Sequence, residues 1–242
     1  MKITEDCIAC DLCIPYCPVN AISMGDDIAQ INEDECVECG VCFRSGVCPT
    51  DAIQETPLEW PRIIRKVLSD PLVESPDTRV PGRGTEEVKT NEVSGRIKPG
   101  WAGVAIELGR PGVGTRFTDV QKVTMAMAAI GAVFEHENPV TFWITDQKTG
   151  KLREDILNEK SLSAIVEVAF PIDKLKAAIQ KLQEVAKQLD TVCSVVTAVK
   201  VSPDGSFATD PIFKELGLTP YPNSKNNVGL GRPLFKFEEV SS

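Results

Sequence analysis

Eight of the nine cysteines lie in two short runs, and their spacing could hold metal. The runs read CIACDLCIPYCPVNAI, with Cys7, Cys10, Cys13 and Cys17, and CVECGVCFRSGVCPTDAI, with Cys36, Cys39, Cys42 and Cys48. Each ends in Cys-Pro, two further residues and Ala-Ile, and the second begins 29 residues after the first. This internal repeat predicts two similar halves packed about a pseudo-twofold axis.

We read no export signal in MKITEDCIAC, so we expect these thiols to bind metal rather than form disulfides. A zinc site is the simplest alternative, but zinc usually takes two Cys-x-x-Cys pairs. Two triplets, each followed by Cys-Pro, do not fit that scheme. Three cysteines separated by two residues wrap one corner of a cubane iron–sulfur cluster, and the fourth lies too far along the chain to reach that cluster comfortably.

Residues 1–57 resemble the bacterial-type two-[4Fe–4S] ferredoxins, in which the fourth cysteine of each run binds the other cluster. The resemblance implies one cluster on Cys7, Cys10, Cys13 and Cys48, and a second on Cys36, Cys39, Cys42 and Cys17. One departure is the five residues FRSGV before Cys48, where the first run has three before Cys17. We expect this longer loop to affect the potential and exposure of the first cluster.

Charge is concentrated in the same segment. Residues 1–57 hold 11 acidic and 2 basic residues, which equals the net charge of -9 of the whole chain. This field disfavours nucleic acid and favours a basic protein partner. It also favours the oxidised clusters, so we expect low reduction potentials. No apolar run is long enough to span a membrane, and oxygen-labile clusters indicate the cytoplasm of an anaerobe.

The chain beyond residue 57 falls into three parts. Residues 58–100 begin with an amphipathic helix near Pro61, carrying Ile63, Ile64, Val67 and Leu68 on one side, and continue as a Pro- and Gly-rich linker or wrapping segment with scattered apolar anchors. Residues 101–201 follow as a regular domain. Residues 202–242 form a C-terminal extension.

The regular domain has the order β-α-β-β-α-β. Strands are expected at residues 101–108, 140–145, 162–170 and 191–201, and helices at 118–132 and 171–189. Thr118 or Asp119 is expected as the N-cap of the first helix. The predicted fold class is therefore α+β: a two-[4Fe–4S] ferredoxin domain followed by a split βαβ, ferredoxin-like sandwich that needs no iron.

A glycine-rich loop, ELGRPGVGTRF, joins the first strand of this domain to its first helix. Free N–H groups at the helix start and two arginines could hold an anion. The candidate ligand residues are Gly109, Arg110, Gly112, Gly114, Thr115 and Arg116. The phosphate motifs match poorly, however, because the lysine of a P-loop and the third glycine of a dinucleotide loop are missing. We favour a tight connection that needs glycine dihedrals.

Two weaker resemblances concern the same region. Pro111-Gly112 lies where ACT-type regulatory domains often carry a Pro-Gly that meets an effector. The strings PGRGTEEVKTNEVSGR and ELGRPGVGTRF are similar to the ferredoxin-containing part of 6-hydroxynicotinate reductase, which implies reduction of an unsaturated ring. His136, the single histidine, is expected in a surface loop, and Cys193 is expected to be buried and inert.

These observations favour an electron-transfer subunit of an anaerobic oxidoreductase, with two [4Fe–4S] clusters, a larger catalytic redox subunit and an electron donor or acceptor protein as partners. The alternatives are a self-contained ferredoxin-domain reductase of an unsaturated or aromatic small molecule, with its substrate site between Arg110 and Arg116, and a redox-coupled regulator that binds a ligand. No catalytic residue is identified.

Overall fold

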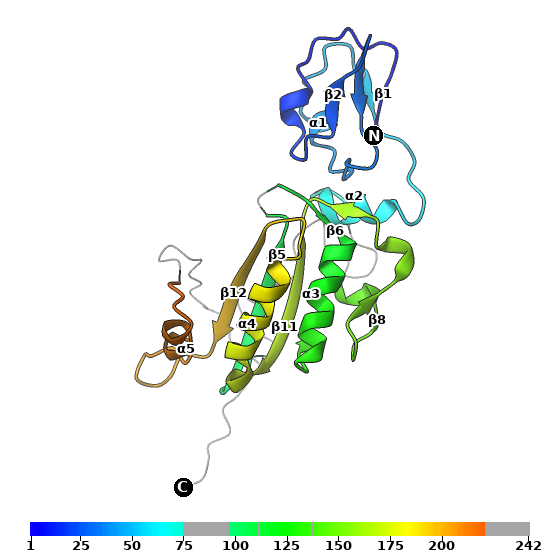
Figure 1. The fold of residues 1–242 in the computed structure, drawn as a ribbon. Helices are drawn as coiled ribbons and strands as arrows, with labels where there is room; N and C mark the ends of the chain where they lie inside the picture. The colour runs from blue at the N-terminus through cyan, green and yellow to red at the C-terminus, as the bar shows by residue number, and fades with distance from the viewer. Residues whose placement is uncertain (75–96, 111, 137, 221–242) are drawn as a thin grey trace.

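A computed structural model of the chain describes residues 1–74, 97–110, 112–136 and 138–220. Figure 1 shows a small cysteine-rich unit standing on the end of a larger α/β unit, with the helix α2 (Ile63–Ser69) at their junction. Among the described residues, no helix is both long and apolar enough to cross a membrane.

The cysteine-rich unit is built from two antiparallel strand pairs. β1 (Lys2–Ile3) pairs with β4 (Ile53–Gln54), and β2 (Ile22–Met24) pairs with β3 (Ala29–Ile31). The β1–β4 pair closes the unit by joining its first and last residues. Two short helices complete it, a 3₁₀ turn at Ile14–Tyr16 and α1 (Val41–Arg44).

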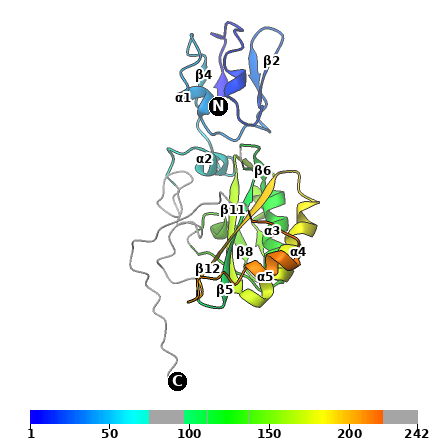
Figure 2. The ribbon, with the colours of Figure 1, turned by 90° about the vertical axis from the view of Figure 1, so that its left-hand side faces the viewer.

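The larger unit contains one four-stranded sheet in the order β12-β5-β11-β7. Its strands are β5 (Trp101–Leu108), β7 (Val133–Phe134), β11 (Ala164–Pro171) and β12 (Cys193–Val199). All neighbours run antiparallel. The helices α3 (Phe117–Ala129) and α4 (Leu175–Ala186) cover the same face of the sheet (Figures 1 and 2).

The main core lies between this face and the two helices. Alternate residues of β5 and β11 point into it, as the period of two in a strand requires. The fully buried members include Ile106, Leu108, Phe170, Phe117 and Leu175. Phe117 also makes an edge-on contact with Trp143, with ring centroids 5.7 Å apart.

The strand predicted at residues 140–145 was wrong over residues 140–143 and as a member of the main sheet. Thr141–Trp143 form a 3₁₀ turn, and β8 (Ile144–Asp146) pairs only with β9 (Lys151–Leu152) outside the main sheet. The side chain of Asn138 accepts a hydrogen bond of 2.9 Å from the backbone N–H of Val140, which favours the turn. The place beside β11 is taken by the short strand β7, which follows Gly131 in a left-handed conformation.

The start of α3 also differs from the prediction. Its N-cap is Arg116, without a capping side chain, and Thr118 and Asp119 lie within the first turn. The free N–H groups of Phe117 and Thr118 donate instead to the carbonyls of Glu159 and Leu157. A neighbouring backbone segment therefore replaces the side-chain cap that the sequence indicated.

The remaining elements are short. β6 (Thr115–Arg116) pairs with β10 (Lys160–Ser161), 3₁₀ turns occupy Glu154–Ile156 and Ile172–Lys174, and α5 (Asp210–Glu215) follows the sheet. The predicted wrapping segment lies mostly outside the described residues, as does the end of the C-terminal extension. In the helix predicted at the start of residues 58–100, Ile64, Val67 and Leu68 are buried, whereas Ile63 is 40% exposed.

Candidate metal centres

Two small cavities in the cysteine-rich unit are each surrounded by four thiols. Cys7, Cys10, Cys13 and Cys48 line the first cavity. Cys17, Cys36, Cys39 and Cys42 line the second. Each cavity thus combines three cysteines of one run with the last cysteine of the other run. These are the two sets that the resemblance implied.

The backbone repeats along with the sequence. Left-handed φ values occur at Ala9 (54°) and Asp11 (61°) in the first run, and at Glu38 (56°) and Gly40 (69°) in the second. The members of each pair occupy equivalent positions between the cysteines. Such conformations turn successive N–H groups inward and make a concavity that favours anions, as at many iron–sulfur sites. The loops therefore suit a group whose sulfur atoms carry negative charge.

The Cys-Pro segments add direct N–H···S contacts. The N–H of Ala21 donates to Sγ of Cys17 at 3.1 Å, and the N–H of Ala52 donates to Sγ of Cys48 at 3.2 Å. Burial opposes the charge on Cys48, but hydrogen bonds from Thr50 and from the backbone lower the pKa of its thiol. Hydrogen bonds of this kind to ligand sulfurs tune cluster potentials.

The thiols of each set lie close enough to disfavour one another's ionisation. Burial, together with the neighbouring thiols of Cys39, Cys36 and Cys17, raises the pKa of Cys42 to about 12. Burial likewise raises the pKa of Cys13, with added contributions from the other thiols of its own cavity. A bound cation would reverse these shifts, because the thiolate is the form that binds metal.

The donor set fits a four-iron cluster better than a single ion. Within the described residues, no three His, Cys, Asp or Glu side chains converge on one ion. Four cysteines around one small cavity suit a cubane, in which each thiolate binds a different iron. The sulfur-only ligands also match cluster chemistry.

The two sites differ in their surroundings. In the first, Cys10 is exposed, Asp11 lines the cavity, and the neighbouring Ile8 and Leu12 are 61% and 50% exposed. In the second, Cys36 and Cys39 are buried, and residues of the larger unit pair with the acidic side chains directly before Cys36. The second site therefore lies nearer the junction and the first nearer solvent.

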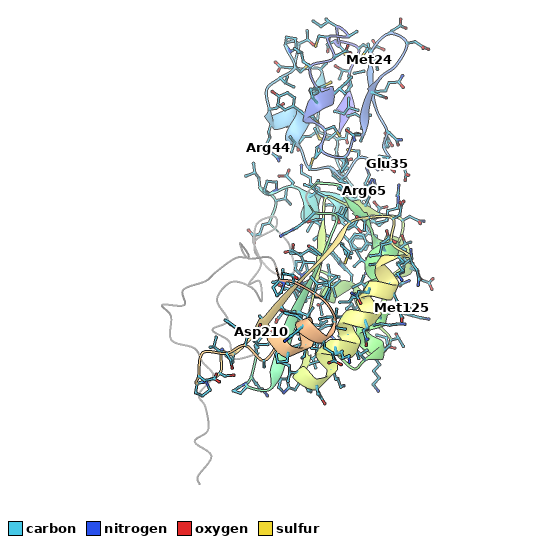
Figure 3. All side chains as sticks on the ribbon, turned by 60° about the vertical axis from the view of Figure 1, so that its left-hand side comes forward. Met24, Glu35, Arg44, Arg65, Met125 and Asp210 are labelled. Carbon is cyan, nitrogen blue, oxygen red and sulfur yellow. The ribbon has the colours of Figure 1, made fainter. Side chains whose placement is uncertain are left out.

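Arg65 of α2 binds the loop that leads to the second site. Its Nη1 donates to the carbonyls of Glu33 (3.1 Å), Asp34 (2.8 Å) and Cys36 (2.9 Å), and its Nε pairs with Glu159 of the larger unit. Figure 3 shows Arg65 at the junction, near Glu35. This buried guanidinium, 5% exposed, thus joins the two units at the backbone of Cys36.

Arg44 binds the same site from inside the cysteine-rich unit. Its Nη2 donates to the carbonyl of Cys39 at 2.6 Å, and its Nη1 pairs with Asp70 at 2.8 Å. A side chain at Gly40 would place its Cβ 2.3 Å from Nη1 of Arg44. The glycine therefore allows the guanidinium to reach the cysteine loop.

The glycine-rich loop forms part of the junction. The Cβ of a residue at Gly114 would lie 3.3 Å from Val19, and one at Gly112 would lie 3.7 Å from Pro18, directly after Cys17. At Gly109 it would lie 2.7 Å from the backbone of Gly114. These glycines let the loop fold tightly against the second site.

The polar residues of this loop already have partners. Arg116 pairs with Asp34 and Glu35, each at 2.6 Å, and Lys160 also pairs with Glu35. Arg110 pairs with Glu107 at 3.2 Å, and Thr115 is buried. The structure thus places the candidate ligand residues in contacts within the protein and joins one of them to the cysteine-rich unit.

Two further candidates are separate from the cluster sites. His136 is exposed, with its ring 6.1 Å from that of Phe142. Cys193 is half-buried rather than fully buried, and burial raises the pKa of its thiol. Neither residue lines a thiol cavity.

Sequence reasoning did not single out Arg44, Arg62 or Arg65. Arg62 pairs with the buried Glu38 at 2.6 Å, so all three arginines hold the second half of the cysteine-rich unit. Arg44 could have been found from the sequence, because it is one of only two basic residues among residues 1–57. The contacts of the other two depend on the placement of α2 and could not be found from local pattern.

Comparison with known proteins identifies the family. Residues 6–52 match the 4Fe-4S dicluster domain. Ferredoxin-3 of Chlorobaculum tepidum is 49% identical over 57 residues, which are 22% of this chain and 92% of that protein. Ferredoxin YfhL of Escherichia coli is 52% identical over 48 residues, which are 20% of this chain. A ferredoxin of Rickettsia felis is 40% identical over 63 residues, which are 24% of this chain.

The matched segment spans 56% of the Escherichia coli protein and 56% of the Rickettsia protein, a little over half of each. It spans nearly all of the Chlorobaculum protein. Together with the two four-cysteine cavities, these matches give the chain two [4Fe–4S] clusters as cofactors. The chain belongs to the ferredoxin family, and its N-terminal unit is a 4Fe–4S dicluster domain.

Proposed function

We propose that this protein is the iron–sulfur electron-transfer subunit of an anaerobic oxidoreductase complex, and that it relays low-potential electrons to a larger catalytic subunit. The observation that carries this proposal is the different placement of the two thiol cavities. One contains the exposed Cys10, and the other is lined by Pro18 and Val19, against which Gly112 and Gly114 of the larger unit lie closely. A relay needs one centre that is accessible to an electron donor and a second centre that passes the electron on to the acceptor.

In this proposal each cluster is bound by three cysteines of one run and the last cysteine of the other run. Cys7, Cys10, Cys13 and Cys48 hold the first, and Cys36, Cys39, Cys42 and Cys17 hold the second. Support comes from the two cavities, which group the thiols in this way. Bound there, each cluster accepts and releases one electron at a time. The protein contributes inward N–H groups, N–H···S bonds and the charges around each loop.

The charges favour electron flow from the first cluster to the second. Asp11 lines the first cavity and disfavours an added electron there. Arg44 and Arg65 donate to the carbonyls of Cys39 and Cys36 at the second site and favour an added electron. Clusters bound in these cavities would have the higher potential at the second site, and this difference would favour electron transfer from the exposed end toward the junction.

We further propose that residues 101–201 form a split βαβ sandwich that docks the carrier to its partner, with residues 58–100 as connecting segment and 202–242 as extension. The antiparallel order β12-β5-β11-β7 supports this arrangement, with β7 in place of the predicted second strand. The acidic residues around exposed Ile8 and Leu12 suit a basic donor or acceptor protein. A cytoplasmic location in an anaerobe follows from the oxygen lability of such clusters.

The ligand sets can be tested with two single substitutions in the full chain. Cys48→Ser removes the proposed fourth ligand of the first cluster, and Cys193→Ser serves as the matched control outside both cavities. Anaerobic iron analysis should give about eight irons per chain for the control and a loss confined to the first cluster for Cys48→Ser. Loss of the cluster held by Cys36, Cys39 and Cys42 would refute the pairing.

The subunit role can be tested by anaerobic purification from the native organism. A native mass well above 26.3 kDa, with a second and larger polypeptide, is the expected result. A lone chain that reoxidises its reduced clusters with a small unsaturated substrate would instead support the self-contained reductase. The site then expected between Arg110 and Arg116 has weaker support, because Arg116 already binds Asp34 and Glu35.

A further inference from the structure

We propose that an aromatic pocket beside α2 binds a planar, conjugated ring compound. The pocket has a volume of about 620 Å³ and opens between α2 and the 3₁₀ turn Thr141–Trp143. Its aromatic walls are Trp60, Phe142 and Trp143, and its aliphatic walls include Ile63 and Val67. This volume and lining are typical of small-molecule sites, which are mostly apolar with a few polar groups.

The rim of the pocket exposes large apolar side chains that a monomer would otherwise bury. Trp60 is 45% exposed, Ile63 is 40% exposed and Phe142 is 39% exposed. Trp143, at 7%, forms the buried wall between them. Exposed apolar residues that gather around one concavity indicate a binding site, whereas apolar residues scattered singly over a surface do not.

Trp60 is held in place despite its exposure. Its Nε1 donates to Oδ2 of Asp155 at 2.6 Å, and the guanidinium of Arg153 lies 4.6 Å from its ring centroid. Arg153 in turn donates twice to Asp155, at 3.0 and 2.7 Å. These bonds lower the pKa of Asp155 to about 2, so the arrangement persists at neutral pH. A preordered aromatic surface lowers the entropic cost of stacking a ligand.

The charges around the pocket favour an uncharged ring. Lys66 pairs with Glu55 at 2.6 Å, Arg153 pairs with Asp155, and Glu74 also lines the pocket. Both cations thus already bind a carboxylate, and an additional acid faces the site. A ligand carrying phosphate or several carboxylates would gain little here, whereas stacking on Trp60 and Phe142 needs only a flat π-system.

The position of the pocket connects it to the clusters, and this part rests on the proposed ligand set of the second cluster. Ile64 and Val67 of α2 line the pocket, while Arg65 of the same helix donates to the carbonyl of Cys36. The pocket and the second site therefore lie on different sides of one helix, which is about 10 Å wide. A conjugated ring bound there would lie across α2 from the second site.

Equilibrium dialysis of the intact, cluster-loaded protein with riboflavin tests the pocket. Riboflavin is the probe because it is flat, conjugated and uncharged, and FMN is the comparison that adds a phosphate. We expect riboflavin to bind at least as well as FMN. Trp60→Ala and Phe142→Ala should each weaken riboflavin about tenfold, the scale of losing one aromatic stacking partner.

Phe207→Ala is the matched control, because Phe207 is 48% exposed and does not line the pocket. It should leave riboflavin binding unchanged. The proposal is overturned if the wild-type protein does not bind riboflavin up to its solubility limit, or if all three variants bind alike. Iron content measured on the same samples separates this outcome from a failure of the clusters, since a protein with full iron and no riboflavin binding would refute the pocket alone.

Discussion

Replacing Arg44 by glutamine should lower the reduction potential of the second cluster and leave the first nearly unchanged. The guanidinium donates to the carbonyl of Cys39 at 2.6 Å, which brings its positive charge beside a proposed ligand of that cluster. A positive charge stabilises the reduced, more negative cluster. Glutamine keeps most of the side-chain volume but removes the charge, so the reduced form loses this stabilisation.

The size of the shift follows from Coulomb's law. A unit charge about 8 Å from the cluster centre contributes about 2 kcal/mol at an effective dielectric constant of about 20. Since about 59 mV corresponds to a factor of ten in a one-electron couple, this energy equals about 90 mV. The side chain of Arg44 is 28% exposed, and solvent screening reduces the effect, so we expect a shift of about 50 mV.

The assay is an anaerobic redox titration monitored by electron paramagnetic resonance. Arg153→Gln is the matched control, because Arg153 also pairs with an aspartate but lies on the larger unit, away from both thiol cavities. It should shift neither cluster. A shift below about 10 mV at the second cluster, or an equal shift at both clusters, would refute the electrostatic reasoning.

Three further changes probe other parts of the account. Asp11→Asn removes the charge that lines the first cavity, and asparagine tolerates the left-handed backbone at this position. The same titration should show a higher potential for the first cluster only. Gly114→Ala should lower the free energy of unfolding by about 1–3 kcal/mol more than Gly205→Ala in denaturant melts. The two glycines have φ values of 84° and 83°, but only at Gly114 would a Cβ meet other atoms, at 2.9 Å, so equal losses would contradict crowding at the junction. Arg116 lowers the pKa of Asp34, so this contact stabilises the folded state above the usual aspartate pKa and is lost as pH falls through the lowered value. The protection of the amides at residues 33–36, measured relative to their intrinsic exchange rates at each pH, should therefore fall below about pH 4, and unchanged protection there would contradict the assignment.

The cysteine repeat and its resemblance to two-cluster ferredoxins predict the two clusters, because cluster binding depends on spacing that a short repeat preserves. The strands β5 and β11 coincide with the predicted segments at residues 101–108 and 162–170, where alternating or continuous apolar residues form a buried sheet. These two strands could be predicted from the local sequence because a buried strand needs the apolar residues that make its pattern recognisable.

The junction could not be predicted in this way. Arg65 acts on Cys36 through a contact between residues 29 positions apart in sequence, and Arg116 reaches Asp34 across 82 positions. The apolar run before Ile144 resembles a strand, yet the side chain of Asn138 and burial of Trp143 turn it into a 3₁₀ segment. In each case a tertiary contact overrides local preference.

The proposed function requires two inequivalent clusters that form a directed relay in this chain. An anaerobic reductive titration of the full-length protein, with iron analysis on the same sample, tests it most directly. The account predicts about eight irons and two separate one-electron steps, with the cluster beside Arg44 reduced at the higher potential. About four irons, a single one-electron step, or a higher potential at the exposed cluster would contradict it.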